Sequence, residues 1–95
     1  MSQQVIVTTD APVALKPLLE SAIRSELRML ELGLARTSQR LHAFEHQYGL
    51  TSEEFERRFA AGGEESLDYI EWAGEIKTYH LLKAQQQALQ RVQLH

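Results

Sequence analysis

The sequence predicts an all-α protein: a long helical hairpin with a short helix at its reversal and a short extended N-terminal arm. Apolar residues recur every three or four positions along two long stretches, which is typical of helices that pack along one face. Between those stretches, helix-breaking glycines stand at Gly49 and at 62–63. The 95 residues suffice for one domain, so we place a single helical domain at 12–95 behind an arm at 1–11.

The arm and the first long helix differ in residue type. The segment VIVTT at 5–9 is short and β-branched, which predicts a strand or an extended arm. Pro12 and Pro17 indicate a helix start, because proline fits the first helical turn but not the interior. From Pro17 to Tyr48 only Gly33 interrupts the pattern, at a cost of roughly 1 kcal/mol relative to alanine. The predicted core seam of this helix is Leu19, Ile23, Leu27, Leu30, Leu34, Thr37, Leu41, Phe44 and Tyr48.

Local signals predict the reversal and a short second helix. Gly49 predicts a left-handed stop after the first helix. Thr51 and Glu54 stand at capping-box spacing and begin a helix that we expect to run to about Ala61, where two glycines end it. The apolar face of this helix is Phe55 and Phe59, one turn apart.

The third predicted helix follows Ser66, a capping residue type, and continues from Leu67 to beyond Leu89. Its apolar arc spans roughly 200° on a helical wheel, which is wider than one neighbouring helix needs. The arc is formed by Tyr69, Ile70, Trp72, Ala73, Gly74, Ile76, Tyr79 and Leu81. We therefore expect this helix to contact the first helix and, in addition, either the short helix or another chain.

Three residues on that arc need separate interpretation. Trp72 is either a core residue or an interface anchor, since tryptophan serves in both places. Gly74 predicts the close approach of another helix, because glycine inside a helix otherwise costs stability. His80 lies on the same face and is expected to be an interior histidine with a hydrogen-bond partner.

A second, weaker apolar stripe lies on the first helix, about a quarter turn from its seam at 100° per residue. It consists of Leu18, Ala22, Met29 and Leu32. A hairpin only two helices thick cannot cover both stripes. A four-helix arrangement of two chains would cover them, so we predict a homodimer with this stripe at its interface.

Acidic side chains are concentrated in the middle of the chain, although the net charge is only −3. Residues 51–75 carry eight carboxylates against Arg57 and Arg58. A nucleic-acid surface needs the opposite sign, so direct binding of nucleic acid is not expected. An acidic surface of this kind is either a contact for a basic protein or an ordinary solvated surface.

The N-terminal segment raises one DNA-binding alternative. A short strand followed by helices is typical of ribbon-helix-helix repressors, whose paired strands read bases with Arg, Lys, Asn or Gln. Residues 5–15 contain no basic side chain, and the first helix is too long for that fold. This alternative is therefore set aside.

The amino-acid composition indicates the cellular compartment in which the protein is expected. The chain is 43% hydrophobic and 24% charged, which is typical of a folded, soluble protein. It contains no cysteine, in keeping with a reducing environment. No leader pattern and no stretch of membrane-spanning length occurs in it, so we expect a cytoplasmic protein.

One motif suggests an enzyme. HAFEH at 42–46 matches the H-x-x-E-H pattern of inverted zinc peptidases, in which two histidines one turn apart bind zinc and the glutamate activates water. His42 and His46, however, fall on the polar side of the helix, and a catalytic zinc also needs a third ligand and a substrate chamber. They are weak metal candidates only. We expect no catalytic residues and no cofactor.

A longer block resembles a known group of proteins. The segment FEHQYGLTSEEFERRFAAGGEESLDYIEWAGEIKTYHLLK at 44–83 is similar to small, largely uncharacterised prokaryotic helical proteins that resemble the antitoxin components of toxin–antitoxin modules. Its landmarks are FEHQYG, SEEF and DYIEWAG, which are structural rather than catalytic. The resemblance implies that Phe55, Tyr69, Trp72 and Gly74 are scaffold or partner-contact positions in a protein that acts by binding.

These observations predict a non-catalytic protein-binding module, an antitoxin-like neutraliser of a small basic toxin. The alternatives are a metal-dependent hydrolase that uses HAFEH and a structural adaptor in a larger assembly. The predicted partner surface combines the acidic residues with nearby aromatic ones. It consists of Glu64, Glu65, Asp68, Glu71, Trp72, Glu75 and Tyr79.

Overall fold

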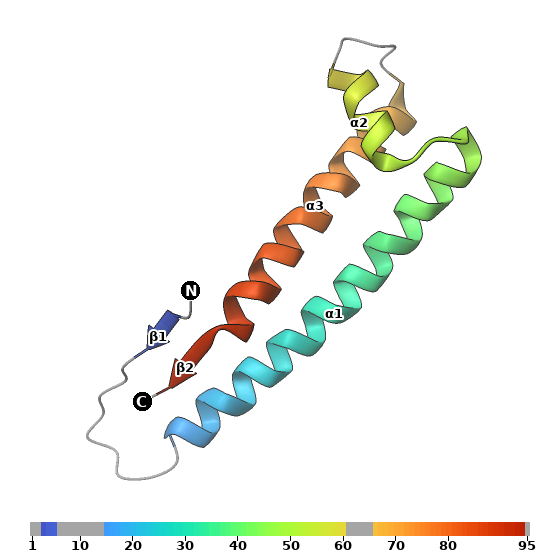
Figure 1. Cartoon of the computed structure of the whole chain (residues 1–95). Helices are drawn as coiled ribbons and strands as arrows, with labels where there is room; N and C mark the ends of the chain where they lie inside the picture. Colours follow the sequence, from blue (N-terminus) through green and yellow to red (C-terminus); the bar gives the residue numbers. More distant parts are fainter. Residues whose placement is uncertain (1–2, 6–14, 61–65, 95) are drawn as a thin grey trace.

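A computed structural model of the chain describes residues 3–5, 15–60 and 66–94. Three helices form the predicted hairpin: α1 (Leu15–Tyr48) and α3 (Leu67–Gln90) lie side by side, and α2 (Ser52–Ala60) lies at their closed end (Figure 1). The molecule is elongated, with principal extents of 59 × 22 × 18 Å. None of the three described helices combines the length and the apolar composition needed to cross a bilayer.

Two short strands lie at the opposite end of the hairpin (Figure 1). β1 (Gln3–Val5) pairs in parallel with β2 (Val92–Leu94), with Gln3 opposite Val92. The sequence predicted a strand near the N-terminus, but one that begins at residue 5. Most of that VIVTT segment lies outside the described residues. The second strand was not predicted. Its VQL sequence is only three residues long and comes directly after the polar end of the third helix.

The capping signals act as the sequence indicates. Gly49 adopts a left-handed φ of 64°, and its amide donates to the Glu45 carbonyl at 2.9 Å, which ends α1. The hydroxyl of Thr51 accepts a hydrogen bond from the Glu54 amide at 3.1 Å and caps α2. Ser66 does the same for α3, accepting from the Tyr69 amide at 3.1 Å. The predicted end of α2 at Ala61 and at the two glycines lies outside the described residues.

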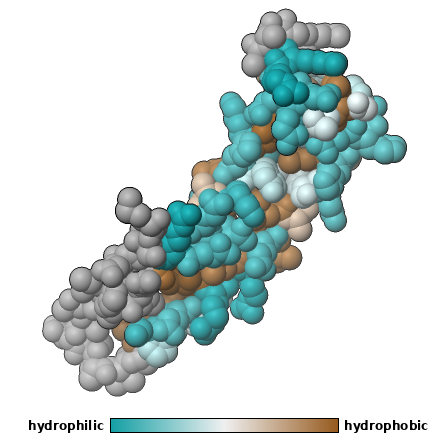
Figure 2. Space-filling model, in the orientation of Figure 1, coloured by the Kyte–Doolittle hydropathy of each residue, from teal (hydrophilic) through white to brown (hydrophobic). Residues whose placement is uncertain are grey.

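The predicted seam of α1 is its buried face. Leu30 and Thr37 are buried, and the other seven seam residues are half-buried. The second stripe is exposed throughout, with 65% of Leu18, 64% of Met29 and 68% of Leu32 accessible. In Figure 2, apolar surface gathers along the line between the two long helices, and hydrophilic side chains cover the flanks.

The core is an aromatic stack centred on Trp72, which is fully buried. Phe55 of α2 stacks on its indole at 4.0 Å, and Phe44 of α1 stacks at 5.6 Å with an interplanar angle of 11°. The indole nitrogen donates a 3.0 Å hydrogen bond to the Ser52 hydroxyl. One side chain thus joins all three helices, and Trp72 is a core residue of the single chain.

Two expectations for α3 were wrong. A Cβ built on Gly74 meets no atom within 4 Å, so this glycine does not admit a neighbouring helix. The close approach occurs at Gly33, where a built Cβ would lie 3.2 Å from Cδ1 of Leu82. His80 is exposed and not interior, and so are Ile70 and Leu81, because the apolar arc that actually packs is narrower than predicted.

Candidate functional site

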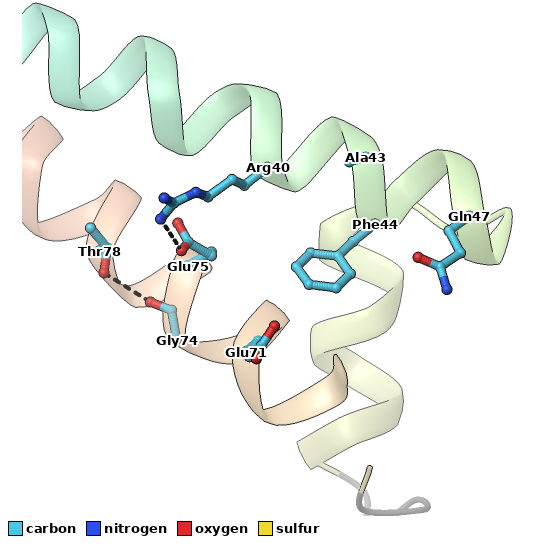
Figure 3. Close-up of a pocket in the computed structure, with 8 residues that line it drawn as sticks. All are labelled: Arg40, Ala43, Phe44, Gln47, Glu71, Gly74, Glu75 and Thr78. Carbon is cyan, nitrogen blue, oxygen red and sulfur yellow. Dashed lines mark hydrogen bonds and ion pairs between the residues drawn. The ribbon is translucent and has the colours of Figure 1, made fainter. Parts of the chain in front are cut away.

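A groove lies between α1 and α3, against the aromatic core, and we refer to it as the α1–α3 groove (Figure 3). Its volume is about 550 Å³, within the range of sites that hold a small ligand or the side chains of a partner. Helix α1 contributes Arg40, Ala43, Phe44 and Gln47, and α3 contributes Glu71, Gly74, Glu75 and Thr78.

The ionisable side chains in the groove give it an acidic balance, with two carboxylates against one guanidinium. Nη1 of Arg40 donates to Oε1 of Glu75 at 2.9 Å. The Arg40 side chain is 57% exposed, whereas that of Glu75 is only 19% exposed. Oε2 of Glu75 is buried and has no hydrogen-bond partner among the described residues. Glu71 is exposed at the edge of the same groove.

The floor of the groove is formed by stacked aromatic rings. The ring of Phe44 projects from α1 toward α3 (Figure 3) and stacks on the buried indole of Trp72. Tyr48 also stacks on Trp72, at 5.8 Å, and its hydroxyl donates to Asp68 at the start of α3. Because these aromatic rings hold one another in place, the lining residues on α1 and α3 are held at a set separation.

The predicted partner residues are divided among several environments. Glu71 and Glu75 line the α1–α3 groove, but Glu75 is paired with Arg40 and is not the outward carboxylate we expected. Asp68 is half-buried at Tyr48, and Trp72 is enclosed in the core, so neither presents a free side chain to a partner. Glu64 and Glu65 lie outside the described residues.

The remaining predicted residue, Tyr79, lines a second hollow on the side of α2. This hollow has a volume of about 280 Å³, and we call it the α2 hollow. Its lining includes His42 and His80, which come from different long helices. His46 is exposed and is not among its lining residues. Within the described ranges, no three His, Cys, Asp or Glu side chains stand close enough to share a metal ion.

Arg40 was missed as a site residue, and so was the position of Gly74 in the wall of the groove. Arg40 meets Glu75 across 35 positions of sequence, and no local spacing rule links residues so far apart. The acidic run alone indicated Glu71 and Glu75. Which of these two glutamates faces Arg40 depends on the register of α1 against α3.

Comparison of the chain with protein-family models, with curated proteins and with solved structures gave no match. The site is therefore interpreted from its own geometry.

Proposed function

We propose that this protein is a non-catalytic binding module that neutralises a small basic protein partner in the cytoplasm, as the antitoxin of a toxin–antitoxin pair does. The observation that supports the proposal is the α1–α3 groove, an acidic concavity built on a stacked aromatic core. Neutralisation needs only that a complementary surface cover the functional surface of the partner. Charge complementarity would provide orientation and a fast association rate.

The proposal includes a homodimer. Leu18, Met29 and Leu32 are exposed on one helix, and such exposed apolar residues favour association when they are contiguous. The α1–α3 groove does not include these residues.

The test is co-expression with the protein encoded by the neighbouring gene. We expect that protein to inhibit growth when it is expressed alone, to be harmless when this chain is present, and to co-purify with it at fixed stoichiometry. The double reversal Glu71→Lys and Glu75→Lys should abolish protection, and the salt dependence of binding should weaken with it. A neighbouring product that neither inhibits growth nor binds this chain would contradict the proposal.

The control for charge reversal is Glu53→Lys and Glu56→Lys on α2. These carboxylates are exposed and line the α2 hollow instead of the α1–α3 groove. The control changes the net charge by the same amount. Equal loss of protection in both double variants would indicate a general charge effect and would contradict the role of the groove.

A further inference from the structure

We propose that the α1–α3 groove receives an arginine side chain of the protein partner, which pairs with Glu75 and Glu71 and lies beside the ring of Phe44. This inference rests on the proposed function, because it names the chemical group through which that partner is held.

The carboxylate of Glu75 is incompletely satisfied within the chain. One oxygen accepts a hydrogen bond from Arg40, and the other is buried without a donor among the described residues. A buried acceptor without a donor costs free energy, so a ligand that brings a donor to it gains affinity. The charge balance of the lining favours a cationic donor.

Arg40 marks where such a cation binds. Its guanidinium reaches Glu75 through one nitrogen, and more than half of its side chain is exposed to solvent. An ion pair made through one nitrogen, with its arginine end largely in solvent, contributes modest stability, so Arg40 can turn toward solvent when a competing guanidinium arrives. If the Glu75 carboxylate rotates to bring the buried oxygen to the groove, the incoming group takes both oxygens in a bidentate pair, which is a stronger interaction.

The aromatic wall favours arginine over lysine. The Phe44 ring projects into the space between the helices (Figure 3). It stacks on the indole of Trp72. A planar guanidinium stacks on an aromatic face, whereas an ammonium group is compact and strongly hydrated. The five donors of a guanidinium also suit a site that offers acceptors from Glu71, Glu75 and the Thr78 hydroxyl.

Gly74 accounts for the room in the groove. No atom lies within 4 Å of a Cβ built there, so the missing side chain is not required by helix packing. A glycine inside a helix is destabilising, and here it leaves the α3 side of the groove without a side chain at this position. The inference therefore explains a glycine that the fold does not need.

The test uses two short peptides and nuclear magnetic resonance. An acetylated, amidated Gly-Arg-Gly peptide is titrated into the full chain, and the same peptide with citrulline in place of arginine serves as the uncharged control. We expect saturable shifts at the backbone amides of residues 71–78 with arginine only. Equal binding of the citrulline peptide, or shifts spread evenly over all acidic residues, would overturn the inference.

Three variants locate the binding. Glu75→Gln removes the charge and Gly74→Leu fills the groove, and each should weaken arginine binding by about tenfold, the factor expected for the loss of one charge-assisted hydrogen bond. Glu56→Gln, which removes an equal charge outside the groove, should leave binding within about twofold. Circular dichroism checks that helix content is kept, and Glu75→Gln alone decides the matter if Gly74→Leu does not fold. Unchanged binding in Glu75→Gln would overturn the inference.

The inference and the proposed function fail in different ways. If the neighbouring gene product binds Gly74→Leu as tightly as the parent chain, and that variant is folded, the arginine site is wrong and the neutralising function stands. If the arginine peptide binds as described but that gene product does not bind at all, the site stands and the proposed function is wrong.

Discussion

The indole nitrogen of Trp72 on α3 donates a 3.0 Å hydrogen bond to the hydroxyl of Ser52, the first residue of α2. Buried tryptophan generally finds a partner for this nitrogen, and here the partner lies on another helix. The bond therefore fixes where α2 begins relative to α3, in addition to satisfying the indole.

Removing that acceptor gives the first prediction. Ser52→Ala should lower the free energy of unfolding by about 1–3 kcal/mol, because the fully buried indole loses its acceptor. Urea denaturation followed by circular dichroism measures the change. Ser21→Ala, at an exposed position on α1, is the control and should change stability by less than about 0.5 kcal/mol. In a Trp72→Phe background the effect of Ser52→Ala should shrink, and full additivity would contradict the proposed coupling.

The second prediction concerns the ring itself. Trp72→Ala should cost about 3–5 kcal/mol, since it empties the centre of a stack that joins three helices. For a domain of marginal stability this is enough to unfold a large share of the molecules at 37 °C. Ile70→Ala on the same helix is the control, because Ile70 is 55% exposed. Thermal melts that superimpose for Trp72→Ala and the parent chain would show that the ring is not the centre of the core.

The third prediction separates three glycines by their surroundings. Gly74→Ala should raise stability by up to about 1 kcal/mol, since helix propensity improves and nothing is in the way. Gly33→Ala should gain less, because its Cβ would lie 3.2 Å from a Leu82 methyl group that has to shift. Gly49→Ala should lose about 1 kcal/mol, because the left-handed φ of 64° strains any side chain. Melting temperatures should follow the order Gly74, Gly33, Gly49, and any other order contradicts the packing described.

A fourth prediction addresses the proposed homodimer. Met29→Glu with Leu32→Glu should convert a dimer into a folded monomer, because charges would replace two exposed apolar side chains of the stripe. Sedimentation equilibrium at micromolar concentration measures the mass. Leu81→Glu, at an exposed apolar position on α3, is the control and should leave the proposed dimer intact. A parent chain that sediments as a monomer at this concentration would refute the predicted interface.

The fifth prediction concerns HAFEH. Double replacement His42→Ala and His46→Ala should leave the melting temperature and partner binding nearly unchanged, because both histidines are exposed. Calorimetric titration with zinc and a peptide-hydrolysis assay are the measurements. Stoichiometric, tight zinc binding that disappears in this variant together with an activity would restore the hydrolase alternative.

The two long helices could be predicted from sequence because their signals, the helical period and the capping residues, act between residues close together in the chain. The seam from Leu19 to Tyr48 follows from helical period alone, and Ser66 and Gly49 act through atoms within a few positions of themselves. Such features do not depend on where the other helix lies. They can therefore be predicted from sequence without reference to the packing of the helices.

Features set by the register of one helix against another could not be predicted. Gly33 and Gly74 look alike in sequence, but only Gly33 faces a side chain of the other long helix. The same holds for His80, since only the observed packing leaves it in the α2 hollow. The pairing of Arg40 with Glu75 also depends on the register of α1 against α3. The α1–α3 groove, which contains this pair, could not be predicted for the same reason.

The pairing of β1 with β2 has a consequence for the order of folding. Gln3 meets Val92, so this contact closes nearly the whole chain into one loop, and the entropy lost in closing a loop grows with its length. A parallel ladder of three residues per strand is too weak to offset that loss alone. The ends therefore join after α1 and α3 have come together and shortened the effective loop. Hydrogen exchange should be faster at β2 than in the centre of α3, and the amides of 92–94 should become protected last during refolding.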